Sequence, residues 1–204
     1  MRSTTREKER VAASPPPRHR SDTLPKAGPD SRDGLVTARL NEGDLAMAKR
    51  KAEVALAEYG HALSLADEAD KTLRAMIYTR LGHANRMLAT GAAGDCYRQA
   101  LSLDKRQVTA LRCLVDEAAE YEDWPEMAEL EERLFATIDD PRHRCLELIA
   151  SGDRWLAAAN APLHARIRYR RALESNPSNA AARHRLKALR PARPDDAGRS
   201  PVVP

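Results

Sequence analysis

Histidine and cysteine are the residues of this 204-residue chain whose chemistry best suits metal binding or nucleophilic catalysis. The chain has six His and three Cys, and one close mixed pair, His143-x-Cys145. No CxxC pair occurs, whereas structural zinc needs four ligands at close spacing. Because Cys96, Cys113 and Cys145 are odd in number and widely spaced, we expect three reduced thiols and no metal site.

A catalytic mechanism needs more than a reactive side chain. A cysteine–histidine nucleophile requires a pocket and a third group that orients the base. The Ala- and Leu-rich middle of the chain supplies neither in its sequence, and a glycine-rich phosphate loop is missing. Trp124 and Trp155 occupy positions that can face a core, so we interpret them as packing residues. We therefore expect a protein that is not an enzyme and needs no cofactor.

Charged side chains are strongly segregated along the chain. Residues 112–133 hold nine acids and two bases, a sum of −7. Residues 164–193 hold nine bases and one acid, Glu174, a sum of +8 with His neutral. Four basic side chains of the last two predicted helices define what we call the basic end: Arg166, Arg170, Arg185 and Lys187.

This segregation allows three interpretations. In the first, the charged runs are solvated faces that keep the helices soluble. In the second, the basic end attracts an acidic partner. In the third, the acidic middle and the basic end attract each other and drive weak self-association. Nucleic acid fits less well, because Tyr169 is the only aromatic residue in the basic stretch and base stacking is poorly served.

The elements that must position these residues follow from a helical signature that occurs three times. It consists of Ala-x3-Tyr-x2-Ala-Leu and starts at Ala55, Ala93 and Ala165. The starts are 38 and 72 residues apart, which leaves room for one degenerate copy. A period near 36 with small residues at helical spacing predicts stacked helical hairpins, because one hairpin cannot bury both of its faces.

Helical periodicity and turn signals predict the remaining elements. A short helix over 35–40 is followed by Asn41-Glu42-Gly43-Asp44, where Asp44 is expected to cap a long helix that runs to about Ala66. The other expected helices span 70–88, 92–103, 106–120, 124–137, 141–159, 162–175 and 178–190. Ser151-Gly152-Asp153 could divide 141–159, but we expect one helix because the turn at 160–162 must precede the third signature.

The two ends of the chain lack apolar periodicity. Residues 1–34 and 191–204 are rich in Pro and charge, so we predict disordered tails around a helical domain at 35–190. A translation start near Met47 would also account for the first tail. No signal-peptide, transit-peptide or membrane-length apolar pattern is visible in the sequence, so we expect a cytoplasmic location and no membrane partner. The abundance of Ala and Arg suggests a bacterial source.

In its helical signature the chain resembles tetratricopeptide repeats. The run from Ala165 to Pro177 resembles the second helix of such a repeat with its terminal proline, and Leu81-Gly82 resembles the small-residue pair of the first helix. The resemblance covers roughly residues 36–190. Lys105 replaces the proline in the second copy, and the unit around Trp124 matches only loosely.

The resemblance implies a right-handed superhelix whose concave groove, lined by the first helix of each hairpin, binds peptides or partner proteins. Alignment to Leu81-Gly82 and Leu114-Val115 implies a set of partner-binding residues: Thr79, His83, Arg86, Arg112 and Asp116. The predicted helix over 141–159 adds Glu147 and Arg154 to this set. The Lys and Asn pattern of the family's two-carboxylate clamp is missing, so chaperone C-terminal tails are not the expected ligand.

The sequence thus predicts an all-α solenoid of about three and a half helical hairpins. Its expected function is that of a non-catalytic scaffold or adaptor for a peptide or partner protein. The alternative is a nucleic-acid-associated or regulatory protein that uses the basic C-terminal helices.

Overall fold

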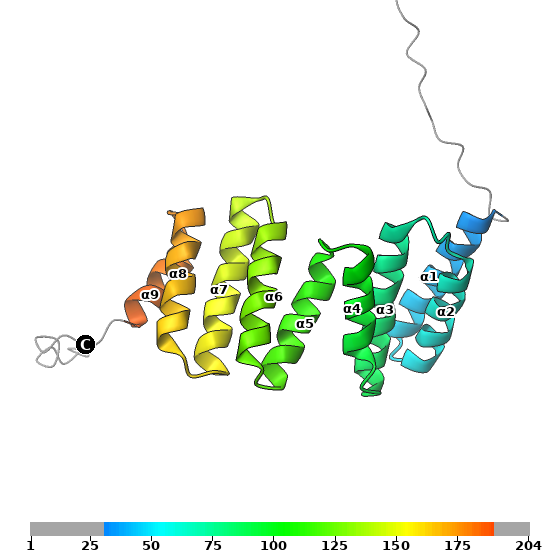
Figure 1. The fold of residues 1–204 in the computed structure, drawn as a ribbon, viewed down its shortest axis with the longest axis horizontal. Helices are drawn as coiled ribbons and strands as arrows, with labels where there is room; N and C mark the ends of the chain where they lie inside the picture. Colours follow the sequence, from blue (N-terminus) through cyan, green and yellow to red (C-terminus); the bar gives the residue numbers. More distant parts are fainter. Residues whose placement is uncertain (1–30, 190–204) are drawn as a thin grey trace, which may run out of the picture.

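The computed structural model of the chain describes residues 31–189, which form helices joined by short turns (Figure 1). The helices are α1 Arg32–Ala48, α2 Ala52–Leu65, α3 Lys71–Leu88, α4 Ala93–Leu103, α5 Val108–Glu120, α6 Trp124–Thr137, α7 Pro141–Ala157, α8 Pro162–Ser175 and α9 Ala180–Ala188. No strand is assigned within this part of the chain, and the predicted all-α class is confirmed. The predicted tails lie outside it, apart from residues 31–34.

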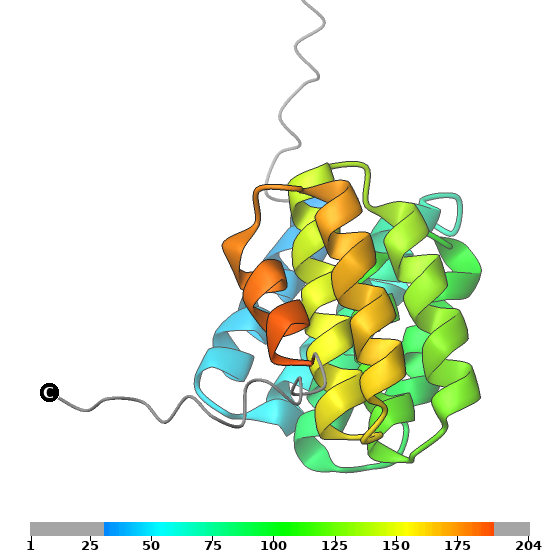
Figure 2. The ribbon, with the colours of Figure 1, turned by 90° about the vertical axis from the view of Figure 1, so that its left-hand side faces the viewer.

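The helices pair into hairpins that follow one another in chain order along the long axis (Figure 1). The pairs are α1/α2, α3/α4, α5/α6 and α7/α8, and each packs on the next. The final helix, α9, packs on α8 at the end of the stack (Figure 2). Residues 31–189 therefore contain four hairpins and a closing helix, one hairpin more than the sequence predicted.

The extra hairpin arises at the N-terminal end, where the prediction of a turn at 41–44 was wrong. Helix α1 runs without interruption from Arg32 to Ala48, with Ser31 as its N-cap accepting a hydrogen bond from the Gly34 amide at 3.1 Å. The chain turns at 49–51 instead, and α2 begins at Ala52. Asp44 is therefore not an N-cap but a residue in the last part of α1.

The remaining boundaries agree with the sequence prediction to within two residues. Asp123 caps α6, its carboxylate accepting from the Glu126 amide at 3.1 Å. Helix α7 is continuous from Pro141 to Ala157, so Ser151-Gly152-Asp153 does not divide it. Across residues 31–189, no helix is both long enough and apolar enough to cross a membrane.

The turn inside each hairpin contains one non-glycine residue with left-handed backbone geometry. These residues are Arg50, Ala89, Glu122 and Asn160, with φ of 57°, 51°, 58° and 46°. A left-handed residue after a helix reverses the chain direction and lets the last turn form its terminal hydrogen bonds. The four hairpins thus close in the same way, although their sequences at the turn differ.

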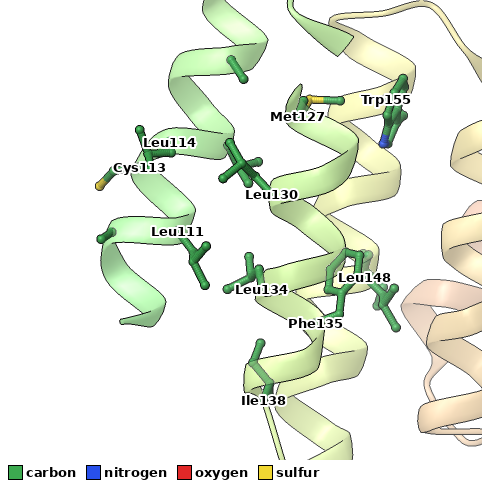
Figure 3. Close-up of a cluster of buried hydrophobic side chains, with 14 of the residues drawn as sticks. Leu111, Cys113, Leu114, Met127, Leu130, Leu134, Phe135, Ile138, Leu148 and Trp155 are labelled. Atoms are coloured by element: carbon green, nitrogen blue, oxygen red, sulfur yellow. The ribbon is translucent and has the colours of Figure 1, made fainter. Parts of the chain in front are cut away.

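Buried apolar side chains form two clusters. The smaller joins α1, α2 and α3, and the larger extends from α3 to α9. Figure 3 shows part of the larger cluster, where Leu130 and Leu134 of α6 point toward α5 and Phe135 points toward Leu148 of α7. Cys113 of α5 points away from α6 in the same view. This packing makes α5, α6 and α7 one continuous block in the middle of the stack.

Candidate functional site

A contact between glycine and tyrosine fixes the spacing of the two helices in three of the hairpins. A Cβ placed on the glycine would lie only 2.3–2.4 Å from ring carbon Cε1 of the tyrosine. The pairs are Gly43–Tyr59, Gly82–Tyr97 and Gly152–Tyr169. Because no larger residue fits against the ring, the glycine in the odd-numbered helix is required for the tyrosine of the signature to pack there.

The residue after each glycine holds the tyrosine hydroxyl. The contacts are Tyr59 to Asp44 at 2.7 Å, Tyr97 to His83 Nδ1 at 3.2 Å and Tyr169 to Asp153 at 2.6 Å. Burial raises the pKa of each of these tyrosines well above its ordinary value. The hydroxyls therefore stay protonated, and each tyrosine bridges the two helices of its hairpin through its ring and its hydroxyl.

The odd-numbered helices are in turn linked to one another by aspartate–arginine ion pairs. Asp44 of α1 binds Arg80 of α3 at 2.9 Å, Asp116 of α5 binds Arg154 of α7 at 3.0 Å, and Asp153 of α7 binds Arg185 of α9 at 2.6 Å. Arg86 of α3 binds Glu120 of α5 and completes the series. Helices α1, α3, α5, α7 and α9 therefore lie side by side in chain order and form one face of the stack. We call this the odd-helix face.

An open cavity of about 540 Å³ lies on the odd-helix face between α1, α3 and the start of α5. Its lining includes both polar and apolar side chains: Asp44, Met47, Tyr59, Met76, Thr79, Arg80, His83, Gln107 and Thr109. Met47 and Met76 are both partly buried and belong to two different helices. Flexible thioether side chains of this kind adapt their shape to an apolar ligand group.

Two of the residues implied by the resemblance line this cavity. Thr79 is buried, and its hydroxyl donates to the Ala75 carbonyl at 2.9 Å within α3. His83 is half-buried, and burial lowers its pKa with smaller contributions from Arg86 and Arg80. A neutral imidazole at His83 suits its contact with the Tyr97 hydroxyl.

The other implied residues are brought together in pairs across neighbouring helices. Arg112 of α5 binds Glu147 of α7. Asp116 binds Arg154 in the next pair. Arg86 of α3 binds Glu120 of α5 at 2.5 Å. These charges stabilise the stack, and each is already neutralised by a partner.

One of the four side chains of the basic end has an ionic partner. Arg185 binds Asp153, whereas Arg166, Arg170 and Lys187 have no ionic partner within residues 31–189. The sequence indicated that almost no acid is close to this end, and the structure corrects this. Three acids of α6 and α7, Glu131, Glu132 and Asp153, form ion pairs with three arginines of α8 and α9, of which only the last belongs to the basic end: Arg168, Arg171 and Arg185.

The sequence did not predict the buried carboxylate of Glu131. Glu131 of α6 is fully buried and accepts from the Trp155 indole at 2.9 Å. It also binds Arg154 at 3.0 Å and Arg168 at 3.2 Å. Aligned on the signature, Glu131 occupies the tyrosine position of the α5/α6 hairpin, and Val115 occupies the glycine position. The sequence did contain a signal for this residue, because Glu131 stands at the position where the three signature copies have tyrosine.

The three cysteines are free, and burial raises the pKa of each thiol. A raised pKa keeps a thiol protonated, which is the unreactive form. Within residues 31–189, no group of three or more His, Cys, Asp or Glu side chains is placed to hold a metal ion.

Helical hairpins of similar length, stacked in chain order and closed by a repeated tyrosine contact, define a tetratricopeptide-like helical repeat fold. Among solved structures, the chain is similar to the crystal structure of a tetratricopeptide repeat protein from Parabacteroides merdae. The match has a TM-score of 0.61 and 18% sequence identity over 76% of this chain, and the chain spans 59% of the length of that protein. No protein-family model matches the sequence, and no curated protein matches it.

Proposed function

We propose that the chain is a non-catalytic interaction scaffold that binds a peptide or a partner protein on its odd-helix face. Repeat stacks of this kind typically serve as binding scaffolds, because neighbouring repeats build one extended surface. The observation that carries the proposal is the cavity of about 540 Å³, which three odd-numbered helices build together. A preformed cavity costs little ordering entropy when a ligand enters it.

The chemistry of this face favours an uncharged, apolar ligand group. The charged side chains around the cavity and farther along the face are already paired, as in Asp44–Arg80, Arg86–Glu120 and Arg112–Glu147. A charged ligand would have to compete with these internal ion pairs. Met47 and Met76 instead offer apolar surface, and burying one large apolar side chain contributes about 1.5–3 kcal/mol.

The proposal is tested by selecting peptides from a displayed random library on the immobilised chain and measuring their affinity by fluorescence anisotropy. Met76→Glu places a charge in the cavity and should weaken binding roughly tenfold or more. Val54→Glu is the matched control, because Val54 is 49% exposed on α2, outside the odd-helix face. Equal affinity of the two variants, or the failure to select any peptide, would contradict the proposal.

The basic C-terminal helices support the alternative function less well. Arg168, Arg171 and Arg185 form internal ion pairs, so fewer cations are free for phosphates than the sequence suggests. Arg166 and Arg170 are the unpaired cations of α8. They suit an auxiliary contact that steers an acidic partner, because exposed charges affect the association rate more than the affinity.

A further inference from the structure

A second cavity, of about 250 Å³, lies where the turn between α3 and α4 meets α5. Its lining comes from these three elements: Asn85, Arg86, Ala89, Gly91, Ala93, Tyr97, Cys113, Glu117, Glu120 and Tyr121. Small and apolar side chains form much of the wall. Among the charged residues of the wall, Glu117 has a carboxylate oxygen that is buried without a hydrogen-bond partner within residues 31–189.

Glu117 Oε2 is buried and has no hydrogen-bond donor within residues 31–189. Three other polar side chains of the cavity have partners. Asn85 donates to the Leu81 carbonyl at 3.0 Å, and Arg86 binds Glu120. Tyr97 contacts His83. Because an unsatisfied buried carboxylate oxygen is costly, this atom marks the place where a ligand could supply a donor.

The structure makes specific room for this carboxylate. A Cβ on Gly94, in the first turn of α4, would lie 2.4 Å from Glu117 Oε1. Gly94 thus allows the Glu117 carboxylate to lie against the first turn of α4, beside the cavity that Glu117 lines. Capping by Glu117 does not explain the arrangement, since within residues 31–189 no hydrogen bond joins its carboxylate to an amide of α4, and the amide of the N-cap residue Ala92 donates to Thr90 Oγ1 at 3.3 Å instead.

The charges around Glu117 favour a cationic donor. Burial raises the pKa of Glu117, Arg98 and Arg86 oppose this effect, and Glu126 and Glu120 add to it. A cation beside the carboxylate would offset both the burial and the repulsion from the neighbouring acids. A neutral donor would satisfy the oxygen without neutralising this charge.

We propose that this cavity receives a lysine side chain of the partner protein, with its ammonium group bound to Glu117. Lysine suits the site because its ammonium group is a compact charge at the end of an apolar stem, and small side chains form much of the cavity wall. Ala89, Ala93, Tyr97 and Cys113 would contact the apolar stem of the lysine. The inference rests on the proposed binding function and adds the chemistry of one ligand residue.

The test is an NMR titration of the ¹⁵N-labelled full chain with Nα-acetyl-lysine amide. We expect saturable shifts of the Gly91 and Gly94 amides, and no comparable shifts with the norleucine analogue, which keeps the stem but lacks the ammonium group. Glu117→Gln preserves the shape and should weaken binding roughly tenfold or more, as for a lost charge-assisted hydrogen bond. Glu122→Gln removes an exposed acid in the next turn and should leave binding unchanged.

Three results would overturn the inference: no saturable shift with the lysine probe, equal binding of the norleucine probe, or unchanged binding by Glu117→Gln. Gly94→Ala provides a second variant that retains the carboxylate but crowds it, and it should also weaken the probe. Met76→Glu, which tests the proposed function, should bind the lysine probe normally. Failure of the lysine site and failure of the odd-helix cavity are therefore distinguishable.

Discussion

The contact between Gly152 and Tyr169 makes a quantitative prediction about the stability of the last hairpin. An added Cβ at Gly152 would lie 2.4 Å from Tyr169 Cε1, and Tyr169 is only 1% exposed. Because the overlap is with a buried ring, we expect the overpacking cost of Gly152→Ala to lie toward the upper end of about 1–3 kcal/mol, above the gain of about 1 kcal/mol from the higher helix propensity of alanine. Gly152→Ala should therefore destabilise the protein.

The effect of Gly152→Ala on stability should change from destabilising to stabilising when the Tyr169 ring is removed. Tyr169→Ala alone leaves a cavity and should cost about 3–5 kcal/mol, as other large aromatic truncations do. In that background Gly152→Ala meets no ring and should stabilise by about 1 kcal/mol. The coupling energy between the two positions is then about 1–3 kcal/mol, the size of the removed clash.

Urea denaturation followed by circular dichroism measures each corner of this cycle. Gly60→Ala is the matched control, because Gly60 lies inside α2 and a Cβ there meets nothing within 4 Å. It should stabilise the parent and the Tyr169→Ala variant by the same amount. If Gly152→Ala behaves like Gly60→Ala in both backgrounds, the glycine is not required by the tyrosine, and the explanation of the repeat is refuted.

Four further predictions concern charge and the turns. Glu131→Ala removes a buried carboxylate that binds Arg168, which is buried, and Arg154, which is partly buried. It should cost about 3–5 kcal/mol in urea denaturation, and a loss below about 1 kcal/mol would contradict the buried network. Glu117→Gln should stabilise the chain, because the folded-state pKa of Glu117 is raised. The gain in unfolding free energy over the parent should be small below the ordinary pKa of 4.5 and should grow as the pH rises above it. A gain independent of pH would contradict this prediction. Ala89→Gly should stabilise by about 1 kcal/mol, since glycine adopts left-handed geometry without steric cost, and unchanged thermal unfolding would argue against that geometry. Reversal of Arg166 and Arg170 to Glu should slow capture of an acidic partner at low salt but not at high salt, whereas binding rates unaffected by the reversal would show that these cations are only solvated.

The sequence predicted the helices that carry the signature because their small residues and tyrosines mark buried positions directly. Ala55, Tyr97 and Ala172 are all almost fully buried. The prediction failed at Gly43, which was interpreted as part of a turn. That glycine lies inside α1 because Tyr59 packs on it, and a contact between residues 16 positions apart is not visible in local propensity.

Prediction of the candidate site was limited in the same way. The implied residues Arg112 and Glu147 do lie on neighbouring odd-numbered helices, but the sequence could not show that they bind each other. The partners are separated by 35 residues, and only the repeat geometry brings them together. For the same reason the acids that bind Arg168 and Arg171 could not be assigned beforehand.

The pairing of glycine with tyrosine also restricts how such a chain can evolve. A mutation of Gly82 alone introduces a clash, and a mutation of Tyr97 alone leaves a void, so either single step is disfavoured. Both positions must change in close succession, and the α5/α6 hairpin, with Val115 and Glu131 at the equivalent positions, has the composition expected after such a double replacement. In an alignment of relatives, these two columns should therefore vary together, and their covariation would identify the repeats more reliably than overall similarity.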